Sequence, residues 1–435
     1  MKIAIVGTGY QGLVVGTCLA EHGHQVVCVD RETARIAALR EGRPPIHEPG
    51  LEELVNRNLE EERLHFTTEL GPAVADCLLI MMCVGTPAGP DGEADVTAVL
   101  EATQEVARAM TGYRIVVNKT TCPMGTAERM KQILREGGEH AFDVVVNPDF
   151  LKEGSAINDF MAPDRIVVGC DDVRVEEIMK ELYSPFLRTG RPVLSMSARS
   201  AEMTKYAVNA MLAARISLMN QLADICEVCG ADIGEVREGL ASDERLGATF
   251  LFPGLGFGGP GLPRDLATCA GLAREHGLNH DLLDAIVQVN ERRQAGFLER
   301  ILAHYGDAIG EKTIALWGAS FKPRTDDLRG APALRIADGL LAAGARLRVY
   351  DPVAGPRLRA RYAEGVEVVP KYYHALDGAD GLVIATEWNE FRRPDYERMG
   401  GLMREKTIFD GRNLYTPAVM KRHGFRYVSI GRPAV

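Results

Sequence analysis

The sequence contains no apolar run that approaches the roughly 18 residues needed to cross a lipid bilayer, so we expect no membrane association. Its start, MKIAIVGTGY, has one lysine and a short apolar stretch before a glycine, which predicts a strand and not a secretion signal. Basic charge is not in excess either, because 60 acidic and 50 basic side chains leave a net charge of −10. Non-specific binding of nucleic acid usually needs a basic face, so we expect no nucleic-acid partner.

The nine cysteines are not grouped with histidines at the spacing of a zinc site, so we expect no metal. An odd number of cysteines without an expected secretion signal favours free thiols, and therefore a cytoplasmic location. Hydrophobic residues make up 46% and charged residues 25% of the chain, which excludes a disordered or fibrous protein. A length of 435 residues predicts two or three domains, each with its own core.

Short apolar runs alternate with amphipathic stretches in residues 1–198, and the same alternation returns in residues 306–435. This pattern predicts two mostly parallel, doubly wound α/β sheets. Residues 199–229 contain no glycine or proline and place apolar residues at helical spacing, which predicts one long helix that ends at Gly230. More helix is expected at 233–240 and 262–305, completing a helical region at 199–305. The expected strands are 3–6, 26–29, 77–84, 115–117, 144–146, 166–168, 313–317, 346–350, 366–368, 381–385 and 407–409.

A glycine-rich turn, Gly7-Thr8-Gly9-Tyr10-Gln11-Gly12, lies between the first expected strand and an apolar helix. Such glycines allow a tight turn and bring backbone N–H groups close to a pyrophosphate at the helix N-terminus. Asp30 ends the second expected strand, where a carboxylate binds both ribose hydroxyls and repels a 2′-phosphate. The unit predicts a Rossmann-like domain for NAD, although the neighbouring Arg31 leaves NADP open, and a glycine turn beside a surface carboxylate is the alternative.

Further segments combine glycine, proline and polar residues in a fixed order along the chain. They are NKTTCPMGT at 118–126, NPDFLKEG at 147–154, PDRIVVG at 163–169, AEMTKYAVN at 201–209, GFGGPGLPRD at 256–265, FKPRTDDLR at 321–329 and DGRN at 410–413. Together with the glycine turn, these segments resemble the nucleotide-sugar dehydrogenases, and the UDP-glucose 6-dehydrogenases most closely. The resemblance covers nearly the whole chain.

The resemblance implies an N-terminal NAD domain, a C-terminal UDP-sugar domain, a homodimer built on the long helix, and a site between the domains. Members of the family oxidise the C6 alcohol of the sugar to a carboxylate with two NAD, through an aldehyde. Cofactor contacts are expected from Gly7, Gly9, Tyr10, Gln11, Gly12, Asp30, Arg31, Cys83, Val84, Gly85, Thr86, Thr121, Glu153 and Arg329. Substrate contacts are expected from Phe150, Leu151, Lys152, Glu153, Lys205, Asn209, Arg245, Phe250, Phe257, Gly258, Gly261, Phe321, Lys322 and Arg412.

The expected catalytic residues follow from the charge that develops when a hydride leaves C6. A buried ammonium such as Lys205 can hold the alkoxide, and Asp265 can take the proton through a water. Thr121 and Asn209, the latter one helical turn after Lys205, can fix that water and the oxyanion. The alternatives are a solvated helix face for Lys205 and a helix cap for Asp265.

The sequence departs from the family in the groups that carry the second oxidation. The family loop reads Gly-Gly-Ser-Cys-Phe-Pro-Lys-Asp, and Gly261 stands where its nucleophilic cysteine would be. Asp149 stands where the family has the glutamate that assists thioester hydrolysis. Glycine cannot form the thiohemiacetal from which the second hydride leaves.

These departures predict that the enzyme oxidises a nucleotide sugar, with UDP-glucose as the expected substrate, to the 6-aldehyde and stops, leaving the aldehyde for a downstream enzyme. Three alternatives stay open: a cysteine-independent route to the uronate, a different reaction on the same scaffold, and a pseudoenzyme that only binds NAD and a nucleotide sugar. Cys122 and Cys269 are less favoured as replacement nucleophiles, because free cysteines usually serve as small packing residues.

Overall fold

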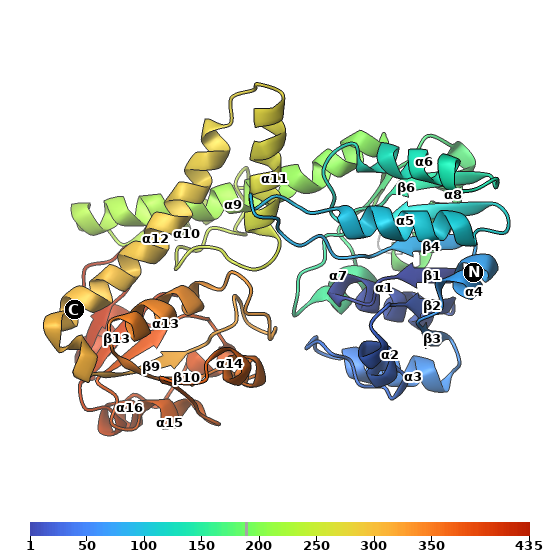
Figure 1. Cartoon of the computed structure of the whole chain (residues 1–435). Coiled ribbons are helices and arrows are strands. Elements are labelled where there is room, and N and C mark those ends of the chain that lie inside the picture. Colours follow the sequence, from blue (N-terminus) through green and yellow to red (C-terminus); the bar gives the residue numbers. More distant parts are fainter. Residues whose placement is uncertain (188–189) are drawn as a thin grey trace. The chain divides into compact units, whose positions relative to one another are not determined.

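The computed structural model describes residues 1–187 and 190–435. The chain divides into two compact units, Met1–Val208 and Asn209–Val435 (Figure 1). Each unit is built around its own sheet, which is mostly parallel in the first unit and fully parallel in the second. The expected three-part division into 1–198, 199–305 and 306–435 stays a prediction. No helix in the described ranges has both the length and the apolar character that spanning a membrane requires.

The described residues of the first unit form a sheet with the strand order β3-β2-β1-β4-β5-β6-β7-β8. All neighbours are parallel except β6 and β7, which pair antiparallel through Val146 and Gly169. This is the doubly wound order, with the first strand in the middle of the sheet. The strands are β1 (Lys2–Val6), β2 (Gln25–Val29), β3 (Leu64–Thr67), β4 (Leu79–Met82), β5 (Arg114–Asn118), β6 (Phe142–Val146), β7 (Ile166–Gly169) and β8 (Val193–Met196).

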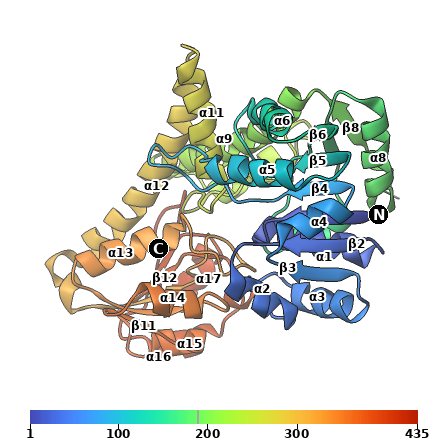
Figure 2. The same cartoon turned by 45° about the vertical axis from the view of Figure 1, so that its right-hand side comes forward.

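Helices cover both faces of this sheet (Figure 2). They are α1 (Tyr10–Glu21), α2 (Thr33–Arg40), α3 (Leu51–Glu60), α4 (Leu70–Asp76), α5 (Thr97–Ala109), α6 (Thr126–Gly137), α7 (Ala156–Met161) and α8 (Val173–Tyr183).

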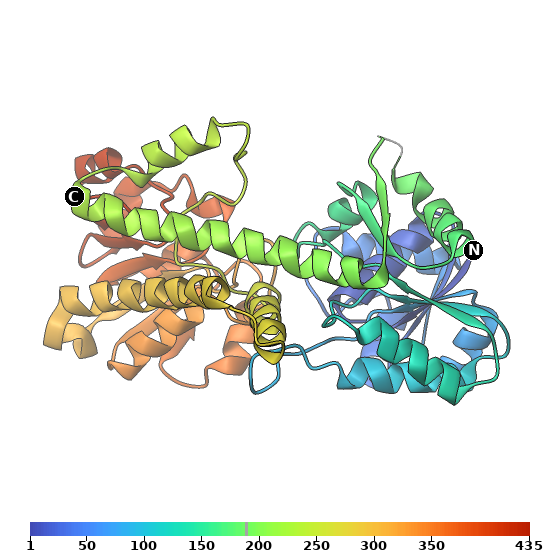
Figure 3. The ribbon, with the colours of Figure 1, turned by 90° about the horizontal axis from the view of Figure 1, so that it is seen from above.

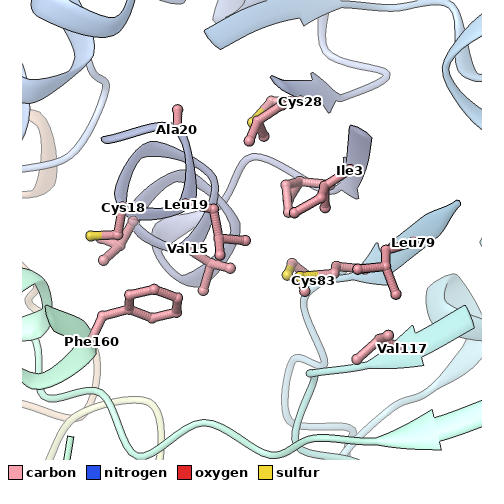
Figure 4. Packing of buried hydrophobic residues seen from close by; sticks show 14 of the residues in the cluster. Ile3, Val15, Cys18, Leu19, Ala20, Cys28, Leu79, Cys83, Val117 and Phe160 are labelled. Carbon is pink, nitrogen blue, oxygen red and sulfur yellow. The ribbon is translucent and has the colours of Figure 1, made fainter. Parts of the chain in front are cut away.

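In β1, the four buried positions from Ile3 to Val6 are all apolar because both faces of the strand are covered. In β1, Ile3 and Ile5 belong to one core cluster, while Ala4 and Val6 belong to the other. This alternation follows from the two-residue period of a strand. Figure 4 shows the first cluster, in which Val15 and Leu19 of α1 lie between Phe160 and the strand residues.

The long helix α9 runs from Ala198 to Cys229, within one residue of the prediction. Figure 3 shows it as one uninterrupted ribbon. It ends where Gly230 takes a positive φ of 75°, a conformation that favours glycine. Its last turn carries Cys226-Glu227-Val228-Cys229, a C-x-x-C pair that the sequence analysis overlooked, and both cysteines are free thiols.

The second unit has a fully parallel sheet with the strand order β11-β10-β9-β12-β13-β14. The helices that follow α9 are α10 (Ile233–Ala241), α11 (Leu262–Glu275) and α12 (Asp281–Tyr305), and the sheet is flanked by α13 (Pro332–Ala342), α14 (Gly355–Arg361), α15 (Tyr372–Leu376), α16 (Tyr396–Leu402) and α17 (Pro417–Arg422). The strands are β9 (Thr313–Trp317), β10 (Arg346–Tyr350), β11 (Val366–Val368), β12 (Gly381–Ile384), β13 (Thr407–Asp410) and β14 (Arg426–Val428).

The predicted fold class, two Rossmann-like sheets and a long central helix, is confirmed. Three short strands were missed: β3, β8 and β14 each lie at the edge of a sheet. Edge strands are only partly buried and so lack a continuous apolar run. The strand expected at 77–84 is shorter, and the helical region expected at 262–305 is broken between α11 and α12. Gly277 takes a positive φ of 65° in that break.

Candidate active site

The turn between β1 and α1 has the shape of a dinucleotide-binding loop. A Cβ added to Gly7, whose φ is +98°, would lie 2.7 Å from the carbonyl oxygen of Cys83. A Cβ on Gly12 would lie 1.9 Å from the carbonyl oxygen of Gly7, but one on Gly9 would meet nothing within 4 Å. Gly7 and Gly12 therefore close the turn, while Gly9 leaves open space beside the N-terminus of α1. The turn fits the pyrophosphate of NAD.

Asp30 lies at the end of β2 and is held by the same turn. Its Oδ2 accepts hydrogen bonds from Thr8 N at 2.9 Å, Thr8 Oγ1 at 2.8 Å and Arg35 Nη1 at 2.9 Å. Burial acts to raise the pKa of Asp30, but these hydrogen bonds outweigh it and hold the pKa below its usual value. The ionised carboxylate suits ribose hydroxyls. Arg35 was missed by sequence analysis, whereas the predicted Arg31 is exposed and lies 3.8 Å from Glu101.

Tyr10 and Gln11 of the turn bond to neighbouring loops. The Tyr10 hydroxyl donates to Glu48, whose Oε2 also accepts from Gly154 N at 2.6 Å. Gln11 Nε2 donates to the carbonyl oxygen of Lys119 at 2.8 Å. Glu48 is buried and was not predicted as a site residue. It ties the turn to the segment that begins at Glu153.

The segments that follow β4 and β5 are joined to each other. Thr120 Oγ1 donates to the carbonyl oxygen of Val84 at 2.8 Å, and Thr86 Oγ1 donates to that of Thr121 at 3.0 Å. Gly85 lies within the first of these segments. Cys83, just after β4, is a buried thiol whose pKa burial raises to about 12. The structure thus brings the predicted residues 83–86 and Thr121 together.

Lys205 of α9 is buried, which excludes the solvated helix face as its role. Its side chain is 11% exposed, and its Nζ lies 3.3 Å from Asp149 Oδ1. The same nitrogen lies 5.3 Å from the centre of the Phe150 ring. Three predicted residues therefore meet at one buried ammonium.

Glu202 lies one turn before Lys205 and was not predicted as a site residue. Its carboxylate accepts hydrogen bonds from Gly125 N at 2.8 Å and Ala127 N at 3.0 Å, where α6 begins. Its burial is the main cause that raises its pKa from 4.5 to about 7. Glu202 therefore joins α9 to the loop that carries Thr121.

A hollow of about 580 Å³, partly open to solvent, lies beside the Asp149–Phe150 segment. The predicted residues Asp149, Phe150, Leu151 and Lys152 line it. It is also lined by residues that sequence analysis did not single out: Lys119, Asn147, Pro148, Asp159, Phe160, Ala162, Pro163, Asp164, Arg165, Ile166 and Tyr183.

In the second unit, Asp265 and Asn209 form the predicted pair. Asn209 Nδ2 donates to Asp265 Oδ2 at 2.5 Å, and Arg264 Nε donates to Asp265 Oδ1 at 2.9 Å. Asp265 is fully buried in the first turn of α11. The position before that helix belongs to Gly261, so Asp265 is not the helix cap. A Cβ built on Gly261 meets nothing within 4 Å.

The glycine-rich loop before α11 is closely packed. Asn290 brackets Phe257 by accepting from its N–H at 2.8 Å and donating to its carbonyl oxygen at 3.0 Å. A Cβ on Gly258 would lie 2.0 Å from the carbonyl oxygen of Gly330, so only glycine fits there. Phe250, at the start of the loop, takes a positive φ of 59°.

The remaining predicted cations of this unit each contact a residue close to them in the structure. The Arg245 side chain is 88% exposed and is bonded to Asp243, so the structure does not bring it to the other predicted residues. The other contacts are Lys322 Nζ at 5.4 Å from the Phe321 ring, Arg329 Nε at 2.8 Å from Asp327 Oδ2, and Arg412 Nε at 3.2 Å from Glu387 Oε2.

A glycine turn that fits a pyrophosphate, an ionised carboxylate after the second strand and a buried lysine define an NAD-dependent dehydrogenase. The chain belongs to the UDP-glucose/GDP-mannose dehydrogenase family, and it is an NAD-dependent nucleotide-sugar dehydrogenase. The family's NAD binding domain matches residues 1–187, its central domain residues 199–292 and its UDP binding domain residues 315–417.

The similarity to known relatives extends over nearly the whole chain. The chain is 44% identical to UDP-glucose 6-dehydrogenase of Pseudomonas aeruginosa, over 100% of this chain and 98% of that protein. The solved structure of a UDP-glucose dehydrogenase from Pyrobaculum islandicum superposes with a TM-score of 0.90 at 35% identity, covering 98% of this chain and 96% of that one. A UDP-D-ManNAc dehydrogenase from Pyrococcus horikoshii gives 0.86 at 28% identity, covering 100% of both chains.

Proposed function

We propose that this enzyme oxidises the C6 alcohol of UDP-glucose to the 6-aldehyde and releases it after a single hydride transfer. The glucose substrate is supported by the relatives from Pseudomonas aeruginosa and Pyrobaculum islandicum. The early stop rests on Gly261 in the loop before α11, which stands where the resemblance to the family leads us to expect its cysteine.

NAD, when bound, accepts the hydride and becomes NADH, while the hydroxyl loses its proton. Lys205 is placed to hold the developing alkoxide, because its buried ammonium has little competing solvent. Asp265 receives the proton through a water, and Asn209 and Arg264 keep its carboxylate in one orientation. Thr121 lies in the loop that Glu202 anchors to α9 and helps to orient that water.

Two of the groups that the family uses for the second oxidation are changed in this chain. A thiol must add to the aldehyde before a second hydride can leave as the family does it, and Gly261 offers no side chain. The Asp149 carboxylate, one methylene shorter than the glutamate expected there, lies 3.3 Å from the Lys205 ammonium, so it is already engaged and is not free to assist thioester hydrolysis. The aldehyde is therefore the end product of this enzyme.

The test is the yield of NADH per UDP-glucose at completion, with product mass spectrometry in the presence and absence of an aldehyde trap. We expect one NADH and a trapped aldehyde. Two NADH and a uronate would contradict the early stop and favour a cysteine-independent route. No NADH from a full panel of nucleotide sugars, with binding intact, would favour the pseudoenzyme instead.

The variant Gly261→Cys sharpens this test, because open space surrounds the position where its Cβ would stand. We expect it to add the missing nucleophile and raise the yield above one NADH per sugar. Gly261→Ser is the matched control, since it is nearly the same size and has no thiol. A yield of one NADH from Gly261→Cys would show that Asp149 also limits the second step, and Asp149→Glu should then be added.

We further propose a homodimer formed through α9. Met211, Leu218 and Ile225 lie seven residues apart on this helix and are 66%, 57% and 54% exposed. Three large apolar side chains on one side of a helix favour burial against a second copy. Leu218→Glu should give a monomer in light scattering, whereas Val173→Glu, at a 71% exposed apolar position of α8, should not.

The biological setting follows from the same chemistry. All nine cysteines are free thiols, which supports a reducing compartment, and we place the enzyme in the cytoplasm. A sugar 6-aldehyde is reactive, so we propose a downstream enzyme that consumes it. The UDP-sugar domain is assigned to 306–435, around the segment that matches the family's UDP binding domain.

A further inference from the structure

Helix α6 begins without a side-chain cap from its own segment. The residue before it, Gly125, takes a positive φ of 88° and has no side chain to offer. The first N–H groups of a helix need outside acceptors, because they have none within the helix. Here Gly125 N donates to Glu202 Oε2 at 2.8 Å, and Ala127 N donates to Glu202 Oε1 at 3.0 Å. A buried carboxylate of α9 therefore caps α6.

This carboxylate joins the two segments that carry Lys205 and Thr121. Lys205 lies three residues after Glu202 on α9, and Thr121 lies four residues before Gly125 in the loop that leads into α6. Thr86 binds the start of that loop at the Thr121 carbonyl oxygen, and Glu202 binds its end. The placement of Thr121 relative to Lys205 therefore depends on the bonds of Glu202. A misplacement of about 1 Å can slow an enzyme about 10²-fold.

The carboxylate holds the loop most firmly when it is ionised. Each of its two oxygens already accepts an N–H bond, so a proton on either oxygen would compete with the donor that faces it. An ionised carboxylate also binds N–H groups more strongly than a neutral one, and the positive end of the α6 dipole favours it. Protonation of Glu202 therefore weakens at least one of the two bonds.

The surroundings of Glu202 place this change of charge near neutral pH. Its burial is the main cause that raises its pKa from 4.5 to about 7. Glu128, in the first turn of α6, also raises this pKa, whereas Arg199, in the first turn of α9, lowers it. These two side chains are paired with each other at 2.7 Å. The next cation along α9 is Lys205, which is paired with Asp149.

We propose that Glu202 is a positioning residue for hydride transfer, and that its ionised carboxylate holds the Thr121 loop against α9 beside Lys205. The inference rests on the roles that the proposed function gives to Thr121 and Lys205. The protonated form leaves the loop less firmly held and the enzyme slower. A buried charge that costs stability is therefore kept because the reaction needs it. Activity rises as Glu202 loses its proton, over the same pH range in which stability falls.

The test is the ratio of kcat between wild type and Glu202→Gln from pH 5.5 to pH 8.5. The amide has one oxygen, so it keeps at most one of the two bonds and resembles the protonated carboxyl. The ratio cancels the pH dependence of all groups that the two proteins share. We expect it to rise from near one to about ten, with its midpoint near pH 7 and with both KM values within twofold.

A purely structural role predicts a different result. It would lower kcat by the same factor at every pH, and a constant ratio would therefore overturn the proposal. Unfolding is not an explanation for a rising ratio, because Glu202→Gln should gain stability relative to the wild type as the pH rises.

Two further variants should move the titration without changing Glu202 itself. Glu128→Gln removes the negative neighbour and should shift the midpoint of the kcat profile to lower pH. Arg199→Gln removes the positive neighbour and should shift it to higher pH. Glu177→Gln is the control, because Glu177 is exposed and paired with Lys180 on α8, and it should leave the profile unchanged. A midpoint that moves in neither of the first two variants would assign the titration to another group.

Hydrogen–deuterium exchange separates this inference from the proposed function. The amides of Gly125 and Ala127 should exchange faster in Glu202→Gln than in the wild type at pH 8, whichever sugar is oxidised. If UDP-glucose yields no NADH, the proposed substrate is wrong, and the kcat ratio is measured with the nucleotide sugar that does reduce NAD. Faster exchange with a constant kcat ratio would leave Glu202 as a structural cap only. Unchanged exchange would overturn its hold on the loop.

Discussion

Lys205 Nζ lies 3.3 Å from Asp149 Oδ1, in a region where the lysine side chain is 11% exposed. The ion pair keeps the ammonium in one place, and the low exposure strengthens its field. Both conditions favour a lysine that stabilises negative charge on a reacting oxygen.

Replacing this ammonium should therefore abolish most of the hydride transfer. We expect Lys205→Met to lower kcat about 10²–10³-fold, the usual cost of removing one group that stabilises an oxyanion. Stopped-flow or steady-state NADH formation measures this. Lys131→Met, which removes a cation paired with Asp171 elsewhere in the first unit, is the control and should leave kcat unchanged. A kcat within threefold of wild type for Lys205→Met would contradict the role.

Glu202 should make the stability of the enzyme depend on pH. Its pKa is raised from 4.5 to about 7 in the folded protein, with burial as the main cause. The folded state therefore holds the proton more tightly than the unfolded state. The resulting stabilisation is complete below pH 4.5 and is lost as the pH rises through about 7, a change of roughly 3 kcal/mol.

The measurement is the unfolding temperature at pH 5, 6, 7 and 8 for wild type and Glu202→Gln. Between pH 5 and pH 8, the unfolding temperature of the wild type should fall by about 5–10 °C relative to that of Glu202→Gln. Glu177→Gln is the control, because Glu177 is exposed and paired with Lys180 on α8. Parallel pH profiles for wild type and Glu202→Gln would contradict the prediction.

Asp30 should determine the choice between NAD and NADP. Its ionised carboxylate is bonded to Arg35, and a 2′-phosphate would meet that negative charge. We expect Asp30→Ala to lower kcat/KM for NAD at least tenfold and to release Arg35 as a partner for the phosphate. The preference for NAD over NADP should then fall about 100-fold, or roughly 2.7 kcal/mol.

The control for this prediction is Arg31→Gln. Arg31 is exposed and lies 3.8 Å from Glu101, so its removal should change the NAD to NADP ratio by less than twofold. If Arg31→Gln changed the NAD to NADP ratio more than Asp30→Ala does, then Arg31, and not Asp30, would determine which cofactor is bound.

Cys122 should not act as the nucleophile of a second oxidation. It is buried, and its Sγ lies 3.9 Å from Asn118 Oδ1 within a core cluster. A thiol in that setting packs and does not attack a substrate. We expect Cys122→Ala to leave the NADH yield per UDP-glucose unchanged, with Cys269→Ala as a second variant. A yield that falls from two NADH to one in either variant would identify the nucleophile.

The sequence predicted those parts of the fold in which a single segment carries its own signal. The helix at 199–229 has no breaker until Gly230, and β1 and β9 have continuous apolar runs because both faces are buried. Three edge strands of the described sheets, β3, β8 and β14, were not foreseen, because they are short, only partly buried and without a continuous apolar run. The remaining edge strand, β11, was predicted at 366–368.

In the candidate site too, the sequence predicted residues of local motifs but not contacts between distant segments. The sequence predicted the glycine turn, Asp30, Lys205 and Gly261 as site residues because their motifs are local in the chain. Glu48 lies 106 residues from Gly154, which it binds, and no spacing rule joins them. Arg165 was part of a resembling segment, but its contact with the Phe150 ring depends on how β7 and the end of β6 are placed side by side.

The sequence alone determined the parallel α/β class and the dinucleotide turn, because each depends on residue types at fixed local spacing. Only the tertiary structure decided which charges are paired. Lys205 meets Asp149, Asp30 meets Arg35, and the carboxylate of Glu202 meets the first N–H groups of α6. The reason is physical: a pair's energy depends on distance and burial, and both arise when segments far apart in the chain pack into one core.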